Sequence, residues 1–213
     1  MKKALFLSCA LASLAPVGAA AHPHIFAEAR LEVVAGDDGH VAALRNVWRF
    51  DEVFSSSVLL DFDTNADLKL DHGELVAIAD TIRTSLADYD YFTFITQDGK
   101  PIAIGKPSEF HVDFKDNQLI VLFSIAPQKP LQIKGKLSFG IHDPTLYTAI
   151  DFTTDDVLAT EGAALAACKR QVVRPDPDEV IAQNQTSLTD AFFNDPAGTD
   201  MGKLFATRLE LAC

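Results

Sequence analysis

The segment 63–74 has the residue types and spacing of a calcium-binding EF-hand loop. Ca²⁺ takes several oxygen ligands, which such a loop supplies from its positions 1, 3, 5, 7, 9 and 12. Here these positions are Asp63, Asn65, Asp67, Lys69 (through its carbonyl), Asp71 and Glu74. Position 6 normally holds glycine because its φ is positive, but here it is Leu68, which is disfavoured there by about 1 kcal/mol or more. We expect a structural Ca²⁺ site; the alternative is an acidic, solvated loop that binds no ion.

Two histidines stand where export would leave a new N-terminus. Residues 1–21 combine two lysines, an apolar stretch and small residues, which is typical of a cleaved signal peptide. Cleavage after Ala21 would make His22 the first residue, and its amine and imidazole could bind a transition ion together with His24. Cleavage after Ala20 would leave only two imidazoles on one side of a strand. The alternative is a pair of partly exposed histidines that bind nothing.

Two further histidines are candidates for a third nitrogen donor. His111 lies in an alternating segment, and His142 stands before Asp-Pro at a predicted strand end. Either residue could equally be structural. A copper enzyme that uses the amine and imidazole of His22 is a separate hypothesis, but the chain has no nucleophile elbow, zinc-protease helix or phosphate-binding glycine loop. We therefore expect a protein that is not an enzyme.

The cysteines indicate structure rather than redox chemistry. Cys9 lies in the predicted signal peptide, so Cys168 and Cys213 remain after export. In an oxidising compartment two cysteines most simply form one disulfide, and two unpaired thiols are the alternative.

The elements that must position these residues are mostly strands. Residues 25–50 predict a β-hairpin, and Asp51 is a candidate N-cap for a helix over 52–62. A second helix is expected at about 73–88, so residues 51–88 form a helix–loop–helix. Further strands are expected at 91–96, 102–114, 118–125, 131–140, 147–152 and 164–173, a short helix at 177–189, and a strand or helix at 204–213. These patterns predict an α+β fold, with an antiparallel β-sandwich-like core and an inserted EF-hand-like helix–loop–helix.

Composition limits the classes of partner. The chain has 213 residues, 48% of them hydrophobic, and a formal net charge of −12. The hydrophobic content is that of a folded protein, and a chain this acidic without a basic run is a poor partner for nucleic acid. After residue 21 no segment is long and apolar enough to span a bilayer. We expect a single exported domain over 22–213, located in the periplasm and without a membrane anchor.

Several short motifs, in their order and spacing, resemble one bacterial family. They are His22-Pro-His24-Ile-Phe26, Trp48-Arg-Phe50-Asp51-Glu-Val-Phe54, the acidic loop to Glu74, Tyr91-Phe-Thr, and Asp143-Pro-Thr-Leu-Tyr147. Over residues 22–213 the chain resembles the domain of unknown function 1007 family, described as the periplasmic component of an uncharacterized ABC-type transport system. Members are often encoded beside nickel/cobalt-type transporters. The resemblance therefore implies divalent-metal handling and a membrane metal transporter as partner. The chain departs from the family pattern at two positions. Leu68 replaces the loop glycine, and His142 stands before Asp-Pro where the family pattern has an aromatic residue.

Together these observations predict a periplasmic metal-binding accessory protein of divalent transition-metal transport, of the nickel, cobalt or zinc type, with a structural calcium loop. The alternative is a calcium-stabilised structural or interaction module without a transported ligand.

Overall fold

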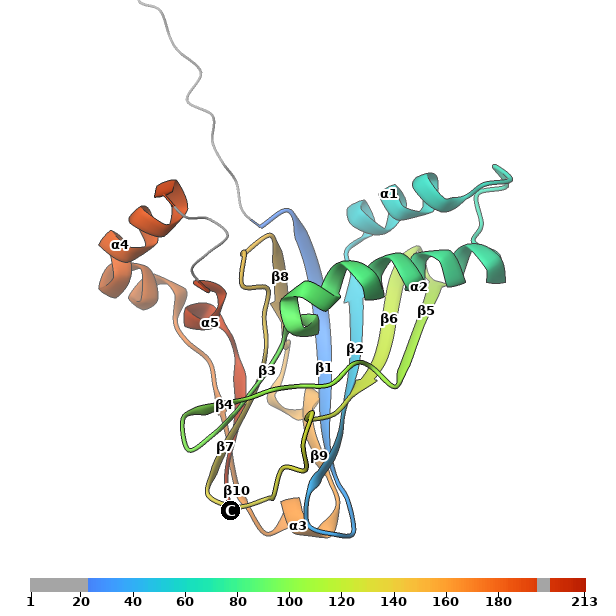
Figure 1. The fold of residues 1–213 in the computed structure, drawn as a ribbon. Coiled ribbons are helices and arrows are strands. Elements are labelled where there is room, and N and C mark those ends of the chain that lie inside the picture. Colours follow the sequence, from blue (N-terminus) through green and yellow to red (C-terminus); the bar gives the residue numbers. More distant parts are fainter. Residues whose placement is uncertain (1–22, 195–199) are drawn as a thin grey trace, which may run out of the picture.

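The computed structural model describes residues 23–194 and 200–213, which form two β-sheets with most of the helices at one end (Figure 1). In these residues the first sheet has the order β5-β6-β2-β1-β8, and β9 also pairs with β1. Its strands are β1 (Ile25–Ala35), β2 (Val41–Phe50), β5 (Glu109–Lys115), β6 (Gln118–Ile125), β8 (Thr148–Asp151) and β9 (Leu158–Glu161). The second sheet has the order β10-β11-β7-β3-β4. Its strands are β3 (Thr93–Gln97), β4 (Lys100–Ile102), β7 (Lys136–Ile141), β10 (Lys169–Val173) and β11 (Arg208–Ala212). The predicted α+β class is confirmed.

The β1–β2 hairpin is the longest antiparallel pair of the first sheet, and it lies where the sequence predicts it. Ala27 pairs with Phe50 at one end, and Val33 with Leu44 near the other. Alternate side chains of β1 and β2 are buried, because successive residues of a strand point to opposite faces. The inward face of both sheets contributes to one hydrophobic core, which includes Trp48 and Phe139.

Two helices connect the first sheet to the second. Helix α1 (Glu52–Phe62) follows β2 directly, and the acidic loop leads into α2 (His72–Leu86), which crosses the strands β2, β6 and β5 in Figure 1. The 3-10 segment η1 (Ala87–Phe92) then leads into β3. A helix–loop–helix therefore lies between β2 and β3, within two residues of its predicted boundaries.

The remaining helices lie in the second half of the chain. They are η2 (Asp155–Val157), α3 (Ala163–Ala166), α4 (Pro177–Asn194) and α5 (Gly202–Phe205). In Figure 1, α4 and α5 lie at the same end of the sheets as α1 and α2. Among the described residues, no helix has the length and apolar character that crossing a membrane requires.

Several predicted segments differ from the structure in extent or type. The predicted strand 102–114 is divided, because β4 ends at Ile102 and β5 begins at Glu109. The predicted strand 164–173 begins as α3, in agreement with the high helix propensity of its alanines. The segment 204–213 contains the end of α5 and then β11. The strand predicted over 131–140 begins only at Lys136.

Strand direction also differs in one part of the first sheet. Strands β8 and β9 both run parallel to β1, although only antiparallel pairs were expected. A parallel pair needs a long crossover connection, which leaves no short turn signal in the sequence.

The predicted disulfide is confirmed. Cys168 and Cys213 are bonded, 45 residues apart in the sequence. The bond joins the start of β10 to the residue after β11, so the last strand is tied covalently to its neighbour.

Candidate metal sites

The acidic loop is organised by its own side-chain oxygens. Asp63 accepts hydrogen bonds from two loop amides, that of Asp67 at Oδ1 (3.2 Å) and that of Leu68 at Oδ2 (2.7 Å). Asn65 Oδ1 also accepts from the amide of Asp67 (2.9 Å), and Asp67 Oδ1 accepts from that of Lys69 (2.9 Å). The oxygens of positions 1, 3 and 5 therefore all turn inward onto the loop backbone.

The backbone at position 6 has the conformation that the calcium-loop spacing requires. Leu68 has a φ of 61° and Ala66 a φ of 59°, so both adopt the left-handed conformation. This conformation is unfavourable for a side chain with a Cβ atom, by about 1–2 kcal/mol. The leucine side chain at this strained position is 68% exposed. Leu68 therefore keeps the loop shape at a cost that glycine would avoid.

Glu74 closes the loop from the second helix. Asp71 and Glu74 form a capping box at the start of α2, in which Asp71 Oδ1 accepts from Glu74 N and Glu74 Oε2 accepts from Asp71 N. The other carboxylate oxygen, Oε1, accepts from both the amide and the hydroxyl of Thr64, each at 2.8 Å. The hydrogen bond from the Asp71 amide, followed by those from Thr64, lowers the pKa of Glu74. Position 12 therefore holds an ionised carboxylate that links both ends of the loop.

In this hydrogen-bonded arrangement the loop is not a preassembled cage. No three His, Cys, Asp or Glu side chains within residues 23–194 and 200–213 converge as metal ligands. The backbone shape and the oxygen donor set suit a hard cation such as Ca²⁺. Its binding would require Asp63, Asp67 and Glu74 to exchange part of their contacts with backbone amides for contacts with the ion.

The candidate nitrogen donors fall in different parts of the molecule. His22 and the predicted signal peptide lie outside the described residues. His24 is exposed at the start of β1, where its amide donates to the carbonyl of Tyr147 (2.9 Å). Its imidazole lies 4.9 Å from the Tyr147 ring, centroid to centroid. The phenol of Tyr147 is therefore the aromatic group next to this histidine.

His111 lies too far across the first sheet to join His24. It pairs with Leu122, which pairs with Val47, and Val47 pairs with Arg30 of β1. Three strand spacings of about 4.8 Å separate His111 from β1, and Arg30 lies six residues along the strand from His24. The structure therefore does not bring these two candidates together.

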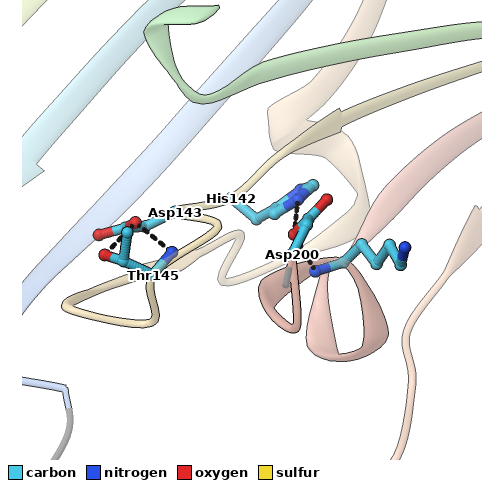
Figure 2. Close-up of polar contacts among 5 residues, drawn as sticks. His142, Asp143, Thr145 and Asp200 are labelled. Carbon is cyan, nitrogen blue, oxygen red and sulfur yellow. Dashed lines mark hydrogen bonds and ion pairs between the residues drawn. The ribbon is translucent and has the colours of Figure 1, made fainter. Parts of the chain in front are cut away.

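His142 is buried at the end of β7 and is already engaged (Figure 2). Its Nε2 lies 3.0 Å from Oδ1 of Asp200, just before α5, and its ring stacks on Phe94 with centroids 4.0 Å apart. Burial lowers the pKa of His142, although the Asp200 carboxylate acts in the opposite direction. The neutral imidazole donates Nε2–H to Asp200, and the buried Nδ1 has no hydrogen-bond partner among the described residues. An ion could reach Nε2 only by displacing Asp200.

The neighbouring Asp143 accepts hydrogen bonds from the turn that follows it, residues 144–148. Its Oδ1 accepts from the amide and hydroxyl of Thr145 (2.8 and 2.7 Å), and its Oδ2 accepts from the amide of Thr148 (2.9 Å). Figure 2 shows the Asp143–Thr145 contacts on one side of the turn and Asp200 on the other. Asp143 therefore holds the turn that leads to Tyr147 and β8.

Comparison with known proteins assigns the chain to a family. A family model described as "Protein of unknown function (DUF1007)" matches residues 7–213. The chain belongs to this family. A second similarity is to the "Uncharacterized 15.5 kDa protein in trpE 3'region" of Spirochaeta aurantia, which is 24% identical over 102 residues, or 48% of this chain and 73% of that protein. The family match confirms the resemblance, while the transport role that it implies stays a prediction.

Three residues of this DUF1007 protein matter to the candidate sites but have no recognisable sequence signal. Thr64 binds Glu74 across the loop, and Asp200 binds His142 from 58 residues away. At Gly202 a Cβ atom would lie 2.2 Å from the carbonyl oxygen of Asp143, so only glycine allows α5 to approach this closely. By contrast, the N-cap residue Asp51, discussed below, was identifiable from its position before a predicted helix.

Proposed function

We propose that this DUF1007 protein is a periplasmic metal-binding accessory protein, without enzymatic activity, whose 63–74 loop holds a structural Ca²⁺. In this proposal residues 51–88 act as an EF-hand-like insertion in a β-sandwich-like core. The observation that carries it is the positive φ of Leu68, together with the inward-turned oxygens of positions 1, 3 and 5. Position 6 of a calcium loop is normally glycine because this left-handed conformation is needed there, and Leu68 adopts it.

The negative charge of the 63–74 loop also favours a bound cation there. Asp63, Asp67, Asp71 and Glu74 bring four carboxylates into twelve residues, against the single cation of Lys69. Their mutual repulsion disfavours the compact loop, and a divalent cation among them would reverse that effect. Its role would be to fix α1 relative to α2.

Thermal unfolding with and without Ca²⁺ tests this part of the proposal. An exported site with a Kd of about 10⁻⁴ M gains about 2.7 kcal/mol of stability at 10 mM Ca²⁺, a rise in Tm of roughly 5–10 °C. Glu74→Gln should abolish the rise. Asp61→Asn is the matched control, because Asp61 is exposed beside the loop but holds no ligand position. An unchanged Tm at 10 mM Ca²⁺, or an equal rise in Glu74→Gln, would contradict a calcium site.

A second candidate function concerns the transported metal. We propose that His22 and His24 bind a divalent ion of the nickel, cobalt or zinc type and pass it to or from a membrane metal transporter. The contact between the His24 and Tyr147 rings supports it, since a phenol in the same part of the surface is a potential oxygen donor. His142 and His111 are left out of this donor set, the first because of Asp200 and the second because of its distance.

A calorimetric titration with metal ions distinguishes this transport function from the alternative, an interaction module without a transported ligand. Removal of His24 by His24→Ala should weaken Ni²⁺, Co²⁺, Zn²⁺ or Cu²⁺ binding at least tenfold. His111→Ala removes another exposed histidine, on β5, and should leave the affinity unchanged. Equal binding by both variants would favour the module. Mass spectrometry of the mature chain tests the His22 start, on which the copper-enzyme hypothesis also depends.

A further inference from the structure

The outward face of α1 is unusual for a helix at the surface of an acidic protein. Residues 53–60 contain no charged side chain, although Glu52 and Asp61 stand directly before and after them. Val53 is 80% exposed and Leu60 is 68% exposed. They are seven residues apart, so they lie on one face of the helix. Surface helices normally carry charged residues on the face that points to solvent, and between Glu52 and Asp61 this face carries none.

The two serines between them add little polarity. Ser56 donates its hydroxyl to the carbonyl of Glu52 (2.6 Å), and Ser57 donates to that of Val53 (3.1 Å). Their donors are therefore satisfied within the helix. The exposed face formed by Val53, Ser56, Ser57 and Leu60 is named the α1 stripe below.

The opposite face of α1 holds the helix firmly in place. Ser55 is fully buried, and its hydroxyl oxygen accepts the amide of Leu119 in β6 (2.9 Å). Val58 is buried in the core. Asp51 binds the first amides of the helix and the amide of Phe26 in β1. The α1 stripe is thus presented on a fixed scaffold, and in Figure 1 α1 lies at the outer edge of the molecule.

The charge around the stripe decides which occupant suits it. Residues 51–90 contain ten acidic and two basic residues, a net charge of −8 out of −12 for the whole chain. A second copy of the chain would bring the same charge, and a bilayer with anionic headgroups would also be repelled. A partner with apolar residues on one face and Lys or Arg beside them is attracted by both features. A Ca²⁺ ion in the loop would reduce the local charge to −6 without changing its sign.

We propose that the α1 stripe, Val53, Ser56, Ser57 and Leu60, is a docking surface for a basic amphipathic helix of a protein partner. Apolar side chains of that helix pack on Val53 and Leu60. Its cations lie toward Glu52, Asp61 and the acidic loop. This inference goes beyond the proposed metal sites and does not depend on an ion in either of them.

Binding of a labelled amphipathic peptide to the full chain tests the proposal. The probe is an 18-residue Leu/Lys helix measured by fluorescence anisotropy, beside a Leu/Glu helix with the same apolar face. We expect the Leu/Lys helix to bind and the Leu/Glu helix not to bind. The double variant Val53→Ser/Leu60→Ser should bind at least tenfold more weakly, as is usual when central apolar contacts are removed. Ser57→Arg keeps both apolar residues and should also weaken binding.

Matched controls use exposed apolar residues elsewhere. Leu122→Ser on β6 and Ile181→Ser on α4 remove partly exposed side chains outside the stripe and should leave the affinity unchanged. The proposal is overturned if the double variant binds as well as the natural chain, or if both peptides bind equally. It is also overturned if sedimentation shows a dimer that the double variant loses, or if vesicles of anionic phospholipid bind through Val53 and Leu60.

Discussion

Removal of the Asp51 side chain should destabilise the protein by an amount that the structure allows us to work out. Oδ1 of Asp51 accepts from the amides of Val53 and Phe54, both at 2.9 Å, and so caps α1. Oδ2 accepts from the amide of Phe26 at 3.0 Å and so joins α1 to the start of β1. Loss of an N-cap costs about 1 kcal/mol, and loss of a hydrogen bond to a charged acceptor about 1.5 kcal/mol. Asp51→Ala should therefore lower the free energy of unfolding by roughly 2–3 kcal/mol.

Asp51→Asn separates the two contributions. Asparagine caps helices about as well as aspartate, but its single carbonyl oxygen cannot also accept from the Phe26 amide. We expect this variant to lose roughly 1–1.5 kcal/mol, between the natural chain and Asp51→Ala. Urea denaturation at pH 7 gives the three free energies. Asp37→Ala, an exposed turn residue, is the control and should change stability by less than about 0.5 kcal/mol.

The effect of Asp51 should also depend on pH. Burial by itself would raise the pKa of Asp51, but the amide hydrogen bonds from Phe54, Phe26 and Val53 outweigh it and lower the pKa. A carboxylate with a lowered pKa in the folded state contributes its full stabilisation above the unfolded pKa of about 3.9. The difference between the natural chain and Asp51→Ala should therefore shrink as the pH falls below about 4. A difference under 0.5 kcal/mol at pH 7, or one that grows in acid, would refute this reasoning.

Three further substitutions test other features of the fold. Leu68→Gly should raise the free energy of unfolding, measured by urea denaturation, by about 0.5–1 kcal/mol, because relief of the left-handed strain exceeds the entropy that glycine loses on folding. A loss of stability in this variant would contradict the positive φ of Leu68. Gly202→Ala should cost about 1–3 kcal/mol, since its Cβ meets the Asp143 carbonyl at 2.2 Å, and an unchanged Tm would disprove that close approach. Replacement of Cys168 and Cys213 by serine should cost about 4 kcal/mol for a closed loop of 45 residues, and equal melting of this variant and the oxidised chain would contradict a structural disulfide.

The sequence by itself determined the features that depend on neighbours along the chain. The β1–β2 hairpin follows from strand-favouring residues on both sides of the Gly36-Asp37-Asp38-Gly39 turn. The two helices around the acidic loop follow from the N-cap residue Asp51 before the first helix and from the local spacing of the loop pattern between them. The disulfide was predictable because only Cys168 and Cys213 lie outside the predicted signal peptide. In each case the interacting groups are a few residues apart or have no alternative partner.

The tertiary structure alone decided which distant residues meet. Parallel pairing of β8 and β9 with β1 follows from crossovers that have no turn signal. The sheet order keeps His111 three strands from β1, and the approach of α5 gives Asp200 to His142. These contacts depend on how the strands are ordered and packed, and many different orders satisfy the same alternation of apolar and polar residues. The choice among the candidate histidines therefore had to come from the folded chain.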